Sequence, residues 1–566
     1  KDSTTSAQIS VFRGSLIFKQ TRFKGKLEFN NTFFLQPVEA EGAIFNDAAN
    51  LTQSRFSRRV SFTNANFRRQ VDFSGSVFFD EANFKETQFK KNAEFKNTTF
   101  ENSADFSNAI FQDIANFSRA RWEGTTNFSK ARFIEQIQFT KANFQDFLFL
   151  KETSFTQSAI FREAQFNLPV NMRGASILNQ ADFSDAVFGK GAYLNVPSLI
   201  FNSDKAKILG NPGEIGVALQ IPKLSGNQNV FRNLIQNFRQ LQQIADANEL
   251  EYSKQRLYLN YLTSRLIDLN INNASQKRLI NLGFSKNQAE AIIKRRQNEF
   301  FQVKSELLTL ADIDEETFTQ LASRFVVGET FTPAKWLLQT WKWLALSLLL
   351  LLSGYGTNFY LVFGVGIIAI AFFSLLFWLV DRFRRVHPYK IVPTAYETTW
   401  MLGSFLISTL LGAIAIFRNT PQPLLTLACM AVIILPLPSF LLFRLYQQGR
   451  YHDLIETSYF TEDGTLRQLR LLIGRLPVIP RYELFRERYL PLLWNRRWNW
   501  LNYYDFSLNN LVKIGFNDVR LRDEHLPGII STLAWYQWIL GILYITLVLW
   551  TLSRTIPGLN LLIYLK

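Results

Sequence analysis

The most regular feature of the chain is a pair of aromatic lanes in its first 190 residues. In the first lane a large apolar side chain, nearly always Phe, recurs every eleven residues from Phe12 to Phe188. The second lane has the same period and runs from Phe18 to Phe183. Spacings of six and then five residues do not follow a helical stripe of period 3.6, but they fit short strands joined by corners, with residues i and i−2 facing inward.

Small side chains, such as Ala65 and Ser76, stand two positions before most first-lane members. This alternation of large and small inward positions predicts a β-solenoid over residues 10–200. Each coil would stack its rings on those of the coil below, and the narrow aromatic core would need no disulfide. Coils of eleven and of 22 residues both fit the period, and both stay open.

Short triplets within the repeat resemble those of pentapeptide-repeat proteins. Ala-Asn-Phe stands at 65–67, 82–84, 115–117 and 142–144, and Ala-Asp-Phe at 104–106 and 181–183. This sequence differs in adding one residue to every second pentapeptide. The resemblance implies a right-handed β-solenoid with an 11-residue period and no catalytic residues. Its long regular faces would suit partner binding, and its outward Lys and Arg, balanced by Asp and Glu, are interpreted as a solvated surface.

The pattern becomes helical after the break at 210–213. Phe231, Leu234 and Phe238 lie on one helical stripe, and residues 228–268 are predicted to form a helical hairpin. A hairpin in this position is similar to the one that follows the repeats in a bacterial, cyanobacterial-like family that carries pentapeptide repeats ahead of membrane helices.

Residues 269–328 resemble the helix-hairpin-helix domain of competence-type DNA receptors in degenerate form. In that family paired hairpin glycines let backbone amides approach a DNA phosphate. Here only Gly283 remains of the first pair, and the second hairpin, 311–316, carries carboxylates that would repel a phosphate. Lys294, Arg295 and Arg296 are the candidate partner or nucleic-acid contacts, but we expect no DNA binding.

The last part of the chain, residues 335–566, is predicted to be a transmembrane domain. Four apolar segments are long enough to cross about 30 Å of hydrocarbon: residues 359–380, 398–417, 424–443 and 532–552. A fifth segment, Trp336–Leu352, is interrupted by Lys342 and followed by Ser353-Gly354-Tyr355-Gly356. It either lies in the interface or forms a fifth span, and we favour the interface.

Arginine and lysine in the short loops predict the orientation. They gather in residues 381–397 and 444–531, which we therefore place in the cytoplasm. With four spans the solenoid lies in the periplasm or a thylakoid-type lumen, and with five it lies in the cytoplasm. We expect four spans in a bacterial plasma or thylakoid membrane. Export of the solenoid would then require a signal peptide removed before Lys1.

Two further motifs concern the membrane part. The loop 444–531 combines arginine with tryptophan, which suits a helix lying on an anionic leaflet or, equally, a compact subdomain. Its candidate lipid contacts are Arg486, Arg488, Arg496, Arg497, Trp498 and Trp500. Gly354-Tyr355-Gly356 invites comparison with potassium-channel filters, but the residues around it do not match a filter. A similar element precedes the first span in the membrane family named above.

Composition and charge narrow the function. One cysteine excludes an internal disulfide framework, three histidines leave little material for a metal centre, and the net charge of +16 fits cytoplasmic loops of a membrane protein. Apart from Lys342 in the doubtful segment, the four spans contain no ionisable residue of the kind that marks ion pathways. We expect no enzyme activity, cofactor or metal.

Two functions stay open. The favoured one is a non-catalytic membrane scaffold or adaptor whose solenoid and helical domain dock membrane, periplasmic or lumenal proteins. The alternative is an ion channel or transporter subunit with the solenoid as an accessory domain. Membrane lipids are the other expected partners, and the choice between a monomer and a homo-oligomer stays open.

Overall fold

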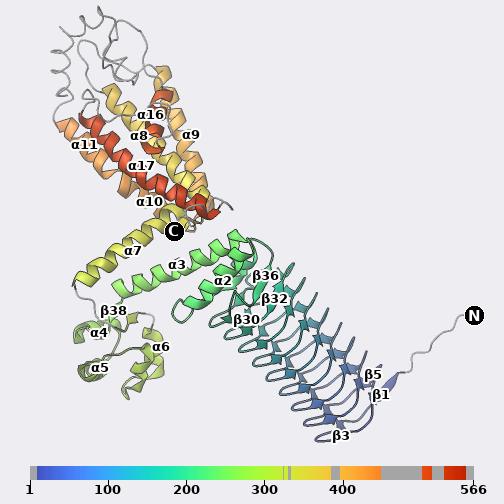
Figure 1. Cartoon of the computed structure of the whole chain (residues 1–566). Helices are drawn as coiled ribbons and strands as arrows, with labels where there is room; N and C mark the ends of the chain where they lie inside the picture. The colour runs from blue at the N-terminus through green and yellow to red at the C-terminus, as the bar shows by residue number, and fades with distance from the viewer. Residues whose placement is uncertain are drawn as a thin grey trace, which may run out of the picture. The chain divides into compact units, whose positions relative to one another are not determined.

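The computed structural model describes residues 9–322, 324–328, 333–383, 395–447, 500–512 and 528–555 (Figure 1). These residues form two compact units, one ending at Tyr258 and the other beginning at Leu259. The first unit is the solenoid with its helical end, and the second contains a small helical domain and a bundle of apolar helices.

The solenoid consists of four parallel sheets of nine or ten short strands. We name each by its first strand: the β1 sheet runs from β1 (Ser10–Phe12) to β33 (Val187–Phe188), and the β3 sheet from β3 (Arg22–Phe23) to β35 (Ile200–Phe201). The β2 sheet runs from β2 (Leu16–Ile17) to β37 (Leu219–Gln220), and the β4 sheet from β4 (Leu27–Glu28) to β36 (Lys207–Gly210).

Strand register gives the length of one coil. In β1 and β5 (Thr32–Phe34), Ser10 lies opposite Thr32, and in β11 (Asn66–Phe67) and β15 (Gln88–Phe89), Phe67 lies opposite Phe89. Each strand thus pairs with the fourth strand after it, so a coil has four sides and 22 residues. The longer of the two coil lengths left open by the sequence is therefore the one adopted.

Both aromatic lanes lie in the interior, as the sequence predicted. Phe106 is fully buried and stacks on Phe84 and Phe128 of the adjoining coils, with ring centroids 4.7 and 4.8 Å apart. Within the coil it meets Phe95 and Phe117 edge to face. Stacking along the axis and edge contacts across it are the two favoured geometries of aromatic pairs, so one residue type fills the core.

The small inward residues are also buried, and where they are polar their hydroxyls have partners. Thr87 Oγ1 donates a hydrogen bond to the carbonyl oxygen of Phe62, 2.8 Å away in the coil below, and Thr98 Oγ1 donates to that of Phe73 at 3.0 Å. Neither Thr side chain is exposed. Because each hydroxyl is hydrogen-bonded, a small polar residue can replace alanine in this position at little cost.

The corners explain part of the Ala-Asn-Phe and Ala-Asp-Phe triplets. Asn83 Oδ1 accepts a hydrogen bond from the backbone N–H of Lys85 at 2.9 Å, and Asp105 Oδ1 accepts one from Ser107 at 2.8 Å. The residue that follows each turn amide has a positive φ, 60° at Glu86 and 56° at Asn108. The Asx side chain thus stabilises a corner in which a non-glycine residue adopts the left-handed conformation.

The strands extend beyond the predicted end at residue 200, through β36 and, after α1 (Ile215–Ala218), β37. The predicted helical hairpin is α2 (Gln228–Gln240) and α3 (Ile244–Ile267). The buried Asn237 accepts from the Ile208 amide at 3.2 Å and donates to the Ile208 carbonyl at 2.9 Å. Asp246 accepts from the amides of Gly213 and Gly216, each at 2.8 Å. The hairpin therefore satisfies the open edge of the last coil, as sheet edges require.

The helical domain of the second unit consists of four short helical segments closed by a strand pair. Its elements are β38 (Leu269–Asn270), α4 (Gln276–Leu282), α5 (Lys286–Asn298), η1 (Lys304–Thr309), α6 (Glu315–Leu321) and β39 (Phe325–Val326). β38 and β39 are parallel, which brings the two ends of the domain together. Asn272, which is buried, bonds to both the N–H and the carbonyl of Phe301 and holds the loop after β38.

The bundle contains the apolar segments that the sequence predicted. Its helices are α7 (Pro333–Ser353), α8 (Phe359–Phe383), α9 (Ala395–Asn419), α10 (Pro423–Ile434), α11 (Pro436–Gln447), α16 (Trp500–Val512) and α17 (Gly528–Thr555), with the short turn η2 (Gly354–Gly356) after α7. Among the described residues four helices are long and apolar enough to cross a membrane: Ala334–Gly356, Phe359–Val380, Ala395–Asn419 and Thr532–Thr555. The predicted segment 424–443 is bent by 43° between α10 and α11, where Pro436 begins a new helix.

The doubtful segment Trp336–Leu352 is part of one continuous helix, α7, in spite of Lys342. Its last turns pack on the bundle, where Leu352 is buried and the Leu351 carbonyl accepts a hydrogen bond from Thr426 Oγ1 at 3.1 Å. Trp336 and Trp341, earlier in the helix, are exposed, and Figure 1 shows α7 leaving one end of the bundle rather than lying along α8. By length and composition alone α7 qualifies as a span.

Candidate functional site

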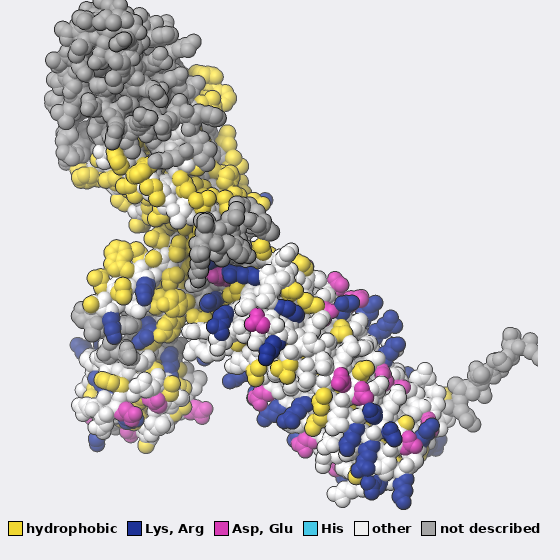
Figure 2. Space-filling view, viewed as in Figure 1, with side chains coloured by type: hydrophobic (Ala, Val, Ile, Leu, Met, Phe, Trp, Pro, Cys, Tyr) yellow, Lys and Arg dark blue, Asp and Glu magenta, His cyan; other side chains and the backbone are white. Residues whose placement is uncertain are grey.

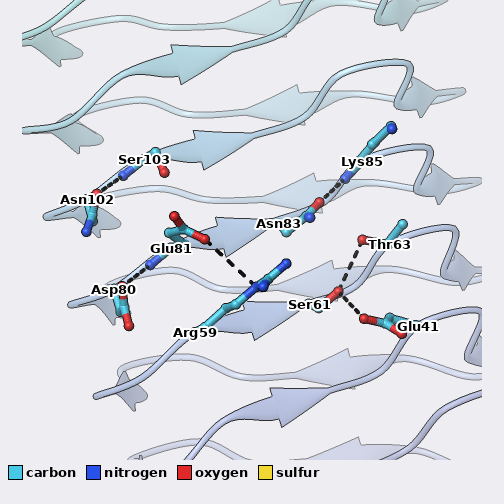
Figure 3. A network of polar contacts seen from close by, with 10 residues as sticks. All are labelled: Glu41, Arg59, Ser61, Thr63, Asp80, Glu81, Asn83, Lys85, Asn102 and Ser103. Atoms are coloured by element: carbon cyan, nitrogen blue, oxygen red, sulfur yellow. Dashed lines mark hydrogen bonds and ion pairs between the residues drawn. The ribbon is translucent and has the colours of Figure 1, made fainter.

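The outward side chains of the solenoid form straight rows because residues 22 apart lie opposite one another. Figure 3 shows such rows on the β2 sheet and on the corner before it. Arg59 and Glu81 are neighbours in one row, with Arg59 Nε 3.9 Å from Glu81 Oε2. Ser61 Oγ donates to Glu41 Oε1 at 3.2 Å and lies 3.1 Å from Thr63 Oγ1. The surface is a regular lattice of short polar contacts.

The four faces divide into two kinds. On the β2 and β4 sheets many outward Asn and Asp side chains cap the next corner and are occupied there. The β1 and β3 sheets present a varied set in that position. On the β1 sheet these are Arg55, Val77, Thr99, Arg121, Asn143 and Gln165. The β1 and β3 faces are therefore the ones whose side chains are free to differ from coil to coil.

Charge on the solenoid is mixed. Figure 2 shows Lys and Arg interspersed with Asp and Glu over the visible face. The ion pairs that form are exposed, such as Lys91 Nζ 3.6 Å from Asp113 Oδ2, and pairs of this kind contribute little to stability. On the β4 sheet, burial raises the pKa of Glu94, opposed by a hydrogen bond from Asn116 at 2.8 Å. The faces lack one dominant sign and do not resemble a nucleic-acid surface.

One corner carries exposed apolar side chains. Phe147 and Leu168, on successive coils between the β1 and β2 sheets, are 41% and 36% exposed. Phe149 lies beside Phe147, with ring centroids 6.1 Å apart. We call Phe147, Phe149 and Leu168 the apolar corner. Exposed aromatic groups of this size favour contact with another protein, although a single small cluster does not identify one.

The three candidate contacts in the helical domain have different environments. Lys294 is exposed, and Arg295 forms an ion pair with Glu299 at 2.9 Å. Arg296 Nη1 donates to the backbone carbonyls of Ile271 and Ala274, each at 2.7 Å. The guanidinium of Arg296 therefore holds the loop after β38, so its position in the sequence does not make it a surface contact.

Backbone amides of the first hairpin already have partners. Gly283 N–H bonds to the Ile280 carbonyl at 3.0 Å. Ser285 and Gln288 form a reciprocal capping box that satisfies the amide of each, at 2.9 and 3.2 Å. In the second hairpin, hydrogen bonds from Thr317 hold the pKa of Asp314 below its usual value, so this carboxylate stays ionised. A phosphate would find few free donors and a fixed negative charge here.

We therefore expect the purified chain to bind duplex DNA weakly or not at all at roughly physiological salt, because backbone contacts supply most non-specific affinity. Fluorescence anisotropy of a labelled duplex, titrated at two salt concentrations, checks this. Micromolar binding that weakens with salt and disappears in a Lys294→Ala, Arg295→Ala variant would contradict it. Lys19→Ala, a cation of the solenoid, serves as the control substitution.

The Gly-Tyr-Gly element forms the reversal between α7 and α8. Gly354, Tyr355 and Gly356 all have positive φ, of 54°, 59° and 74°. A Cβ on Gly356 would lie 2.9 Å from the Trp550 ring, and Arg554 Nη1 donates to the Tyr355 carbonyl at 3.1 Å. The element is a packed turn against the end of α17, which explains why two glycines are needed.

The predicted lipid contacts Arg486, Arg488, Arg496, Arg497 and Trp498 lie outside the described residues. Trp500 is described, and its ring stacks on that of Trp400 with centroids 5.9 Å apart. The assignment of 444–531 as one loop outside the bundle was wrong for its α16 part: Tyr503 and Phe506 of α16 are buried in the bundle core. Trp and Tyr suit a headgroup layer and a helix interface equally well, so composition did not distinguish them.

The sequence analysis also missed buried polar groups of the bundle. Because the second span was drawn from residue 398, Glu397 was left out, yet α9 begins at Ala395 and Trp378 Nε1 donates to Glu397 Oε1 at 2.9 Å. Uncharged amides were not considered at all, and Asn509, Asn510 and Gln537 are buried. Helical periodicity over 500–512 would have found the first two. Within the described part of the chain, no group of three or more metal-binding side chains occurs.

Comparison with known proteins supports the two soluble folds. A family model described as pentapeptide repeats (9 copies) matches residues 40–88, 84–121, 106–153 and 150–195. A second, described as the helix-hairpin-helix motif, matches residues 267–326. These are the solenoid and the small helical domain that the residue patterns indicated. The searches of curated proteins and of solved structures gave no match.

Proposed function

We propose that the protein is a non-catalytic integral membrane scaffold or adaptor, whose solenoid and helical domain dock other proteins of a membrane complex. The observation that supports this most directly is the contrast between the solenoid faces: two are bound up in capping the corners, and two present outward side chains that vary from coil to coil. A rigid rod with such rows offers extended, specific contacts without a catalytic cleft.

The membrane part anchors this rod. Four helices long and apolar enough to span a membrane support membrane association, and Figure 2 shows apolar side chains over the described helices of the bundle. The finer placement is part of the proposal: a bacterial plasma or thylakoid membrane, with the solenoid in the periplasm or lumen. It rests on the arginine and lysine asymmetry of the loops, which orients membrane proteins.

The docking proposal predicts a partner that depends on the solenoid surface. We expect affinity purification from native membranes, followed by mass spectrometry, to recover partner proteins with the wild-type chain. A Phe147→Ser, Leu168→Ser variant should recover less of them, because exposed aromatic anchors dominate binding energy. Ile134→Ser, which removes an apolar side chain of 41% exposure from another corner, is the matched control. Recovery of the same proteins as from membranes lacking the chain would reject the scaffold function.

A further inference from the structure

Helix α16 penetrates the bundle to the middle of the apolar helices. Its Phe506 ring lies edge to face with Phe377 of α8, with centroids 4.8 Å apart. One residue later, Ser507 Oγ donates to the Ile370 carbonyl at 3.0 Å. Ile370 stands close to the centre of the apolar stretch Phe359–Val380, so α16 reaches the level at which a spanning helix would cross the bilayer midplane.

The C-terminal end of α16 lies deep along α17. A Cβ on Gly541 would come within 2.3 Å of the Leu511 carbonyl oxygen, so the two backbones touch there. Gly541 is thirteen residues beyond Gly528, the start of α17, which is about 20 Å along the helix. Because Ser507 contacts Gln537 and Leu511 contacts Gly541, the two helices run in the same direction, and α16 ends inside the bundle.

Uncharged polar groups line this buried helix. Gln537, fully buried on α17, donates from Nε2 to the Ser507 carbonyl at 2.8 Å and to Ser507 Oγ at 2.7 Å. Ser374 Oγ donates to the same Ile370 carbonyl that Ser507 contacts, at 2.6 Å. Three helices, α8, α16 and α17, thus contribute to one polar cluster inside an otherwise apolar core.

Three amide atoms of these helices have no hydrogen-bond partner among the residues that the structure describes: Gln537 Oε1, Asn509 Oδ1 and Asn510 Nδ2. The side chains are 0%, 5% and 4% exposed. Buried polar atoms are nearly always satisfied, and at this depth the lipid offers no substitute. Two acceptors and one donor without partners indicate that something else satisfies them.

We propose that α16 is a half-helix that places Asn509, Asn510 and Gln537 as a binding position for a small uncharged solute with both hydrogen-bond donors and acceptors, on a path through the bundle. The chemistry of the cluster favours an uncharged solute over an ion. Its side chains are amides and hydroxyls without formal charge, and both donors and acceptors are left over. An ion at this depth would need a compensating charge or a full set of carbonyl ligands. This site is independent of docking by the solenoid.

Reconstituted vesicles test the proposal, with urea and glycerol as probes and water as the reference. The full chain should raise the permeability to at least one of the two solutes above that of protein-free vesicles, measured by stopped-flow light scattering. Asn510→Leu and Gln537→Leu should lower it by about tenfold each, the size expected for one lost hydrogen bond to a bound solute. Thr546→Val, an exposed polar residue of α17, should leave it unchanged.

A second measurement separates binding from mere packing. Asn510→Leu removes an amide whose Nδ2 is unpaired, so it should leave the thermal stability of the protein unchanged or raise it. Loss of permeability together with retained stability supports the site. Wild-type vesicles permeable to neither solute, or to water alone, would overturn it, as would variants with unchanged solute permeability. Potassium or sodium flux that Asn510→Leu abolishes would overturn the uncharged class.

Discussion

Replacing Phe106 by aspartate is expected to unfold the coils on both sides of it. Phe106 is fully buried and touches four rings in three coils. Losing a buried Phe side chain alone costs roughly 3–5 kcal/mol. A carboxylate in this aromatic core adds a desolvation cost, since no cation lies inside. The sum is comparable to the whole stability of a typical domain, about 5–15 kcal/mol.

Limited proteolysis of the full chain in detergent measures this effect. We expect new cleavage between residues 84 and 128 in Phe106→Asp, because a solenoid coil is stabilised mainly by its two neighbours. Asn102→Asp is the matched control: it adds the same charge in the same coil, on an exposed side chain whose Oδ1 accepts from the Ser103 amide. Equal protease resistance in wild type and Phe106→Asp would contradict the role assigned to the aromatic lanes.

A cysteine at Asn97 is expected to react with a membrane-impermeant maleimide from the non-cytoplasmic side only. The background is Cys429→Ala, which removes the single native cysteine. Asn97 is exposed at a corner with φ of 56°, and equivalent corners carry Glu86 and Lys130, so a non-glycine residue is tolerated there. A cysteine at Asn495, which lies outside the described residues but within the predicted cytoplasmic loop, should not react from that side.

The physical reason for this expectation is the cost of inserting α7. A spanning α7 would place Lys342 inside the bilayer, at roughly 2.5–3.5 kcal/mol on insertion scales unless it snorkels. An interfacial α7 would instead put Trp336 and Trp341, which are exposed, at headgroup depth. The reverse labelling pattern would show that α7 spans, that the solenoid is cytoplasmic and that its partners are to be sought there.

The sequence by itself determined the aromatic interior of the solenoid, because a strict period leaves one consistent set of inward positions. It did not determine the coil length: periods of eleven and 22 place the same residues inside, and only hydrogen bonding between Phe67 and Phe89 strands distinguishes them. It also missed the role of Asn237, whose partner is the edge of a coil 29 residues away. Contacts of this kind depend on how elements meet, which no local pattern encodes.

The same distinction holds in the second unit. Apolar length identified the membrane helices, since hydrocarbon thickness is a fixed physical scale. Whether a polar or aromatic side chain faces lipid, water or another helix is a matter of tertiary packing. Arg296 was a candidate contact in the sequence and is a structural link in the fold, and α16 belonged to a loop in the sequence and to the bundle core in the structure. Side-chain chemistry allowed both outcomes, and the position of neighbouring backbone decided between them.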